Sequence, residues 1–92
     1  MEKQEKIRVG VMLAGVSSER EVSLESGRNI FSKMDRKKYE PAAVFMDSRS
    51  AFWEIPIKLL MRNSTRDIEV DLSEEATQVP YEDLRKRYDF IY

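Results

Sequence analysis

The sequence contains no cysteine and no histidine. Without cysteine there can be no disulfide, no thiolate metal site and no thiol nucleophile, and without histidine the side chain best suited to acid-base catalysis at neutral pH is missing. Glycine and proline are also scarce, with three of each in 92 residues, and no linker rich in proline, glycine or serine divides the chain. The sequence therefore excludes imidazole and thiol chemistry and predicts one domain, residues 1–92.

Neither sign of charge dominates, since 16 Lys and Arg face 17 Asp and Glu for a formal net charge of -1. No global field would attract nucleic acid or an anionic membrane, so we expect neither partner. Apolar runs such as residues 9–15 fall short of the roughly 20 residues that a membrane span needs. The charged first six residues lack the apolar region of a signal peptide, which predicts a cytoplasmic protein.

Hydrophobic residues make up 41% of the chain, enough for a packed core, and two apolar runs predict strands. Residues 7–13 predict a strand buried on both faces, and Ala14 and Gly15 after it permit a sharp turn. Residues 39–46 predict a second strand. Because proline lacks the amide donor of a ladder, Pro41 should lie near the beginning of this strand or on a sheet edge.

A helix is predicted between these strands, beginning near Ser17 and Ser18, where Ser18 and Glu21 fit a capping box. Small and apolar side chains then recur at helical spacing and predict the stripe that packs on the sheet: Ser23, Gly27, Ile30, Phe31 and Met34. Gly27 costs about 1 kcal/mol of helix propensity, so it indicates either close approach of the helix to a strand or simple tolerance of glycine. Strand, helix and strand within about 40 residues predict a right-handed βαβ unit with parallel strands.

The second half of the chain is less regular. Residues 51–60 are apolar but contain Pro56, and residues 68–72 alternate like an exposed strand. Residues 80–87 predict a short helix with proline in its first turn and basic residues in its last. Residues 88–92 predict the start of another buried strand, and because it reaches the last residue without a turn or polar tail, we interpret the chain as part of a longer protein.

Residues 13–27, with the sequence LAGVSSEREVSLESG, resemble the signature near the amino terminus of D-alanine–D-alanine ligases. The signature follows the first strand directly, and residues 35–46 and 88–91 also look like that family, so the resemblance covers the chain from about Lys6. One departure is visible, because the family usually carries glycine where this chain has Ala14. Alanine is tolerated there if its φ stays negative.

The resemblance implies an α/β fold with three layers, in which helices flank a mainly parallel sheet, as in the pre-ATP-grasp, Rossmann-like amino-terminal domain of an ATP-grasp ligase. Such a ligase phosphorylates the carboxylate of one D-alanine, and the amine of a second D-alanine attacks the acyl phosphate to give D-alanyl-D-alanine for peptidoglycan. ATP and Mg²⁺ are bound by domains that this chain lacks, so we expect no cofactor and no catalysis in residues 1–92 alone. The resemblance also implies a homodimeric longer enzyme.

The resemblance assigns Glu19 to the acid that holds the ammonium group of the first D-alanine, and Val22 to a neighbouring apolar contact. A carboxylate at a strand-to-helix turn suits that role, because it makes charge-assisted hydrogen bonds and the helix dipole keeps it ionised. Ser23 is interpreted as helix packing or polar support of the site, and Glu21 as a cap. From pattern alone, Glu19 is one of many acids in first helical turns.

Two other functions stay open: another amino-acid ligase of the ATP-grasp class, and a non-catalytic α/β binding module. A dinucleotide fingerprint, a P-loop and the acidic pair of a receiver domain are all missing after the first strand. Phe52 and Trp53 are assigned to packing rather than base stacking. The basic residues 85–87 are assigned to a solvated helix end, with a phosphate site as the alternative.

Overall fold

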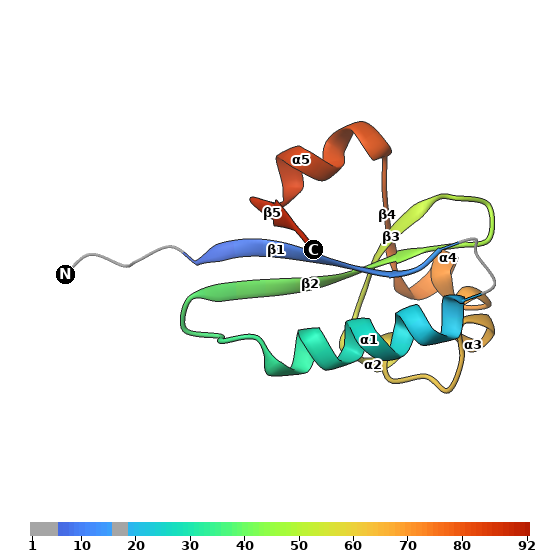
Figure 1. Ribbon diagram of the computed structural model, residues 1–92. Helices are drawn as coiled ribbons and strands as arrows, with labels where there is room; N and C mark the ends of the chain where they lie inside the picture. The colour runs from blue at the N-terminus through green and yellow to red at the C-terminus, as the bar shows by residue number, and fades with distance from the viewer. Residues whose placement is uncertain (1–5, 16–18) are drawn as a thin grey trace.

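The computed structural model describes residues 6–15 and 19–92, and within these ranges five strands form one sheet in the order β4-β3-β2-β1-β5 (Figure 1). The strands are β1 (Ile7–Ala14), β2 (Tyr39–Met46), β3 (Phe52–Ile55), β4 (Thr77–Val79) and β5 (Phe90–Ile91). The helices are α1 (Arg20–Lys33), α2 (Ile57–Leu60), α3 (Thr65–Glu69), α4 (Leu72–Glu75) and α5 (Leu84–Arg87), and a 3₁₀ turn, Tyr81–Asp83, precedes α5. The predicted α/β class is therefore confirmed.

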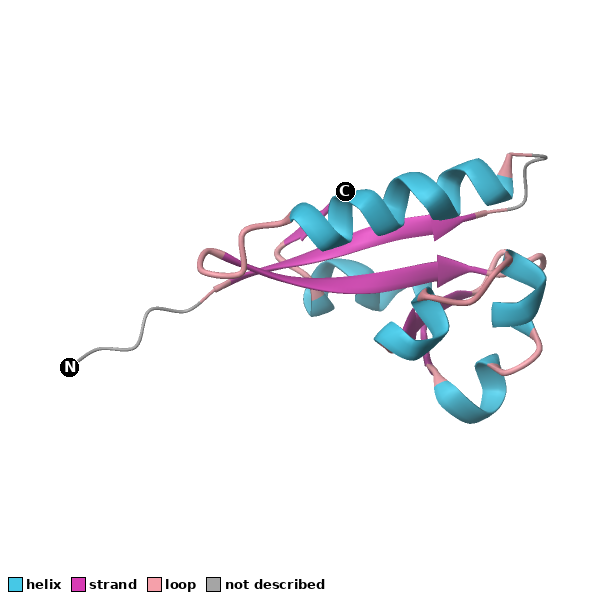
Figure 2. Ribbon diagram, turned by 90° about the horizontal axis from the view of Figure 1, so that it is seen from below, coloured by secondary structure: helices cyan, strands magenta, loops and turns pink. Residues whose placement is uncertain are grey.

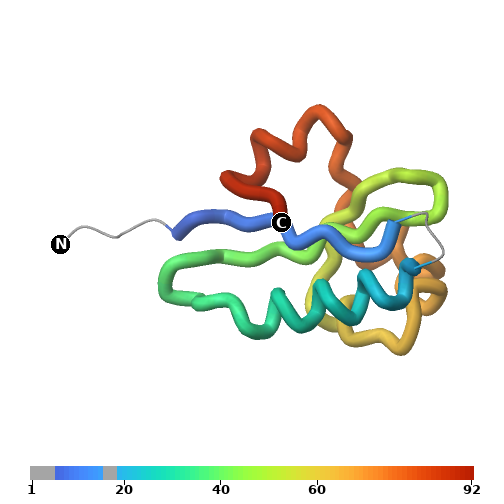
Figure 3. The backbone as a smooth tube through the Cα atoms, in the orientation of Figure 1, coloured from blue at the N-terminus to red at the C-terminus, as the bar shows by residue number. Residues whose placement is uncertain are grey.

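The sheet is mixed rather than parallel throughout. β1 pairs in parallel with β2 along its whole length, from Ile7 opposite Tyr39 to Ala14 opposite Met46, and in parallel with β5 on its other side (Figure 3). The chain then reverses, because β2–β3 and β3–β4 are antiparallel pairs. The predicted parallel unit of strand, helix and strand is confirmed, and the antiparallel half lies beside β2.

Helices lie on both faces of the sheet, which gives the predicted three layers (Figure 2). A hydrophobic core lies on each face. Side chains alternate along each strand, so that Ala43 and Phe45 join the core beneath α1 whereas Val44 joins the opposite core. The α1 core also holds buried residues from four helices: Leu24, Phe31, Leu59, Leu60, Ile68 and Leu72. The α5 core is smaller and contains Val44, Phe52, Val79, Leu84 and Tyr88.

Helix α1 lies along β1 and buries Leu24, Gly27 and Phe31. A Cβ atom at Gly27 would collide with Cδ2 of Leu13 and lie 3.5 Å from the carbonyl oxygen of Met12. Glycine at this position therefore allows α1 to approach β1 closely. This is the first of the two interpretations of Gly27 given from the sequence. Leu24 is fully buried but was missing from the predicted stripe.

The turn after β1 has an unusual backbone. Ala14 has a φ of 67° and Gly15 a φ of 107°, so both lie in the left-handed region. The sequence predicts that alanine is tolerated at position 14 only with a negative φ, and the structure does not meet this condition. An L-residue in this conformation costs roughly 1–2 kcal/mol, and glycine does not carry that cost.

Replacing Ala14 with glycine is therefore expected to raise the free energy of unfolding by about 0.5–1 kcal/mol, since the relieved strain exceeds the extra chain entropy of glycine in the unfolded state. Urea unfolding followed by circular dichroism measures the change. Ser50, with a φ of 68°, offers a second test through Ser50→Gly. The control Ala42→Gly lies inside β2, where glycine should destabilise instead.

Two sequence predictions need correction. Residues 68–72 are not an exposed strand, because Ile68 lies in α3 and Leu72 begins α4, both buried. The last strand is shorter and more exposed than predicted: β5 has two residues, and Phe90 is 59% exposed. The predicted helix over residues 80–87 is confirmed as the 3₁₀ turn followed by α5.

Candidate functional site

The candidate site lies where β1 and β2 end and α1 begins. Because these strands are parallel, their carboxyl ends share one edge of the sheet, and open α/β sheets bind ligands at such edges. The amide of Gly15 donates to the carbonyl of Met46 across this edge at 3.3 Å. We define the carboxyl-edge site by five residues: Gly15, Glu19, Arg20, Ser48 and Glu69.

Glu19 lies at the N-cap position of α1 and is exposed. Its backbone carbonyl accepts the first hydrogen bond of the helix from the Ser23 amide at 3.0 Å. Val22 is 63% exposed on the first turn of α1, and Ser23 is partly buried. The three predicted substrate-binding residues therefore lie together at the start of α1, and their binding roles stay predictions.

Arg20 connects three parts of the carboxyl-edge site. Its Nε donates to the carbonyl of Gly15 at 2.5 Å, and one of its terminal nitrogens donates to Glu69 at 2.5 Å. Glu69 also accepts hydrogen bonds from the amide and the hydroxyl of Ser48, each at 3.1 Å. One arginine and one carboxylate thus join the end of β1, the start of α1, the turn after β2 and the end of α3.

Sequence reasoning missed both Arg20 and Glu69. A signal for Arg20 was present, since a cation in the first turn of a helix opposes the helix dipole and calls for a nearby anion. Glu69 gave no signal, because it is 49 residues away in the sequence. The guanidinium also lies 5.8 Å from the centre of the Phe45 ring, within reach of a cation-π contact.

Glu21 holds the other end of α3. Its carboxylate accepts from the amide of Thr65 and, at 2.5 Å, from the Thr65 hydroxyl. The hydroxyl hydrogen bond of Thr65 is the main reason that the pKa of Glu21 lies below its ordinary value. The predicted capping box pairs Glu21 with Ser18, which lies with Ser17 outside the described residues, so that prediction stays open.

Asp47 organises the turn after β2. Burial alone would raise its pKa, but hydrogen bonds from the Ala51 amide, the Trp53 indole and the Arg49 amide together lower it. The indole nitrogen of Trp53 lies 2.9 Å from the carboxylate. A shallow pocket of about 280 Å³ beside this turn is bordered by Asp47 and Glu69, and the protein already supplies donors to both acids. The partly buried Trp53 packs against the α1 core, as predicted.

A second hydrogen-bonded group joins β3 to α5, on the other face of the sheet. Arg87 pairs with Glu54 at 2.9 Å, and the Tyr88 hydroxyl donates to the same carboxylate at 2.6 Å. Burial and this carboxylate raise the pKa of Tyr88 well above its ordinary value. Arg87 is thus engaged in an ion pair at the helix end, and the group acts as a structural tie.

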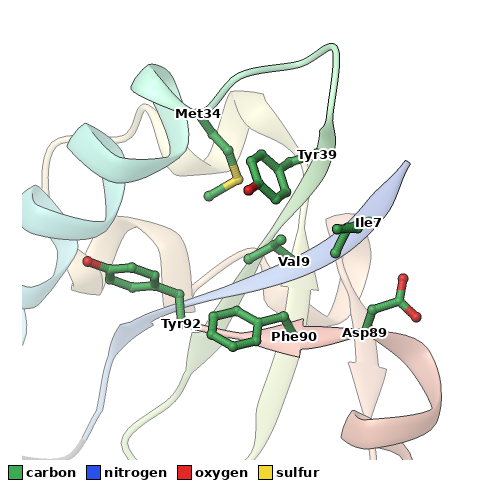
Figure 4. Close-up of a pocket in the computed structure, with 7 residues that line it drawn as sticks. All are labelled: Ile7, Val9, Met34, Tyr39, Asp89, Phe90 and Tyr92. Atoms are coloured by element: carbon green, nitrogen blue, oxygen red, sulfur yellow. The ribbon is translucent and has the colours of Figure 1, made fainter. Parts of the chain in front are cut away.

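The apolar pocket of about 660 Å³ in Figure 4 lies elsewhere. Its lining residues are Ile7, Val9, Met34, Tyr39, Asp89, Phe90 and Tyr92. Ile7 and Val9 belong to the amino-terminal half of β1, so this pocket is at the opposite end of the strand from the carboxyl-edge site. Its lining suits apolar packing and offers few polar groups for catalysis.

Neither a metal site nor a membrane-spanning helix is found in the part of the chain that the structure describes. Within residues 6–15 and 19–92, no group of three or more His, Cys, Asp or Glu side chains is placed to hold a metal ion. Of the helices in these ranges, none is both long and apolar enough to cross a bilayer.

Known proteins similar to this chain are ligases. D-alanine–D-alanine ligase B of Clostridium perfringens is 44% identical over 43 residues, which are 47% of this chain and 14% of that protein. A D-alanine–D-alanine ligase of Lactiplantibacillus plantarum is 52% identical over 40 residues, 44% of this chain and 11% of that protein. The chain thus spans a small fraction of these relatives.

Solved structures of two ligases share the fold. The VanG D-Ala:D-Ser ligase of Enterococcus faecalis matches 89% of this chain and 23% of its own, with a TM-score of 0.69 and 17% identity. The D-alanine–D-alanine ligase of Coxiella burnetii matches 72% of this chain and 20% of its own, with a TM-score of 0.60 and 26% identity.

A family model described as the amino terminus of D-Ala D-Ala ligase matches residues 8–89, nearly the whole chain. The match includes β1 from its second residue, all of β2 and α1, and the residues that define the carboxyl-edge site. The chain therefore belongs to the family of D-alanine–D-alanine ligase amino-terminal domains.

Proposed function

We propose that this chain is the amino-terminal, substrate-binding part of a cytoplasmic, ATP-dependent ligase that joins two D-alanines for peptidoglycan synthesis. The observation that carries the proposal is the position of Glu19, at the first turn of α1 where two parallel strands end. Membership of the ligase family supports the reaction class. The remaining domains would bind ATP and Mg²⁺, and the longer enzyme would be a homodimer.

Glu19 would bind the ammonium group of the first D-alanine. A carboxylate accepts a charge-assisted hydrogen bond from an ammonium donor. Val22, exposed on the same turn, would contact the substrate through its methyl groups, and Ser23 would support the turn. In this role the chain binds and orients the amino acid and leaves phosphoryl transfer to the rest of the enzyme.

The test is Glu19→Gln in a full-length ligase that carries residues 1–92 as its amino-terminal segment. We expect the KM for the first D-alanine to rise roughly 10- to 150-fold, because a hydrogen bond to a charged group contributes about 1.5–3 kcal/mol. Glu25→Gln, on the exposed face of α1, is the matched control and should leave KM unchanged.

Residues 1–92 alone should show neither ATP hydrolysis nor calorimetric D-alanine binding. Turnover by this short chain would contradict the proposed division of labour between domains. A Glu19→Gln enzyme with unaltered KM and kcat would remove Glu19 from the substrate site.

A further inference from the structure

We propose that Arg20 is a positioning residue that fixes Glu19 for ligand binding. This inference rests on the proposed function of Glu19. Arg20 is the first residue of α1, directly after Glu19, and its side chain is 21% exposed. It reaches back to the strand end rather than outward, since its Nε donates to the carbonyl of Gly15.

The contacts of α1 with α3 explain why the first turn of α1 is held in one place. Two consecutive residues of this turn bind opposite ends of α3: Glu21 binds Thr65 at its start, and Arg20 binds Glu69 at its end. Helix α3 thus acts as a brace against the turn that begins at Glu19. The brace continues to the turn after β2, because Glu69 also accepts from Ser48.

Arginine suits this position for a geometric reason. Its planar guanidinium carries several N–H donors in fixed directions, so it can hold the Gly15 carbonyl and the Glu69 carboxylate at once. A lysine would keep the positive charge but would lose the planar set of N–H donors. Small displacements of a binding group have large effects on affinity, so an unbraced Glu19 should bind its ammonium partner less well.

Helix α1 offers a matched control for this inference. Arg28 is also 21% exposed, and it also donates to backbone carbonyls, those of Leu60 and Arg62. Arg28 ties the middle of α1 to α2 and the residues after it, away from the carboxyl-edge site. Loss of Arg28 should therefore reduce stability without altering the turn at Glu19.

The experiment measures KM for the first D-alanine and kcat for Arg20→Met, Arg20→Lys, Glu69→Gln and Arg28→Met in the full-length ligase described above. We expect Arg20→Met to raise KM about five- to tenfold with kcat changed less than about twofold, and Arg20→Lys to restore part of the loss. Glu69→Gln should raise KM in the same direction, and Arg28→Met should not. If Arg20→Met does not fold, Glu69→Gln decides the question.

Equal KM values for Arg20→Met, Glu69→Gln and the unmodified enzyme would overturn the positioning role. The same holds if Arg28→Met raises KM as much as Arg20→Met, because the effect would then be general destabilisation. Glu19→Gln separates the two proposals. If Glu19→Gln raises KM and the Arg20 and Glu69 variants do not, only the positioning role fails, whereas an unchanged KM in Glu19→Gln overturns the proposed function as well.

Discussion

Gly27→Val is expected to lower the free energy of unfolding by about 3 kcal/mol, because it overpacks the contact between α1 and β1. A Cβ atom at Gly27 would already collide with Cδ2 of Leu13, which is 2% exposed and has little room to move. The carbonyl oxygen of Met12 lies 3.5 Å from the same Cβ position. The additional methyl groups of valine would increase this crowding between α1 and β1.

Gly27→Ala should cost less, about 1 kcal/mol, since the better helix propensity of alanine offsets part of the collision. Urea unfolding of Gly27→Ala, Leu13→Ala and the double variant forms a double-mutant cycle. Because truncation of Leu13 makes room for the new methyl group, the double variant should be more stable than the sum predicts. Additive effects, or a stabilised Gly27→Val, would show that α1 does not pack closely on β1.

Glu21→Ala is expected to lower the free energy of unfolding by about 1–2 kcal/mol, because it removes the acceptor of two donors of Thr65. Thr65 is 2% exposed whereas Glu21 is exposed, so water entering the space left by Glu21 would replace part of the lost hydrogen bonding. Helix α3 should separate from the first turn of α1 as a result. Glu25→Ala is the matched control on the same helix, and it should change stability by less than about 0.5 kcal/mol, since the ion pair of Glu25 with Arg28 is exposed.

The contribution of Glu21 to the free energy of unfolding should decrease as the pH falls into the acid range. The pKa of Glu21 is lower in the folded state than its ordinary value of 4.5, chiefly through the hydrogen bond from Thr65. The ionised form is thus favoured by folding, and the stabilisation is complete above pH 4.5 and is lost as pH falls through the folded-state pKa.

The stability difference between the unmodified protein and Glu21→Gln should therefore be largest near neutral pH and shrink in acid. Chemical unfolding of both proteins across this range measures it. A difference that grew as the pH fell would contradict the assigned ionisation of Glu21.

The first half of the fold could be predicted because its elements are long enough to show their periodicity. β1 has eight residues, α1 has 14 and β2 has eight. Between β2 and α5, by contrast, each described helix or strand has three to five residues, less than two helical turns. Ile68 and Leu72 fit the alternation of a strand, but they lie in two separate short helices, α3 and α4, and both are buried in the α1 core.

The candidate site was predictable only where it is local in sequence. The motif places Glu19, Val22 and Ser23 on one turn, and the structure does the same. The partners that brace this turn come from positions 44 and 49 residues further along the chain, and no spacing rule relates them. Long-range contacts of this kind form only when α3 packs against the first turn of α1, so they depend on tertiary structure.

The position of β1 between β2 and β5 affects how the protein can be made. Val9 lies opposite Phe90 and Gly10 opposite Ile91, so the second neighbour of β1 is supplied about 80 residues later. While a ribosome is still translating the intervening residues, one side of β1 presents unpaired amides and carbonyls, which are prone to join with other chains. Closing so long a loop also carries an entropic cost of about 4 kcal/mol. The native arrangement of the sheet can therefore be completed only after Phe90 and Ile91 have left the ribosome.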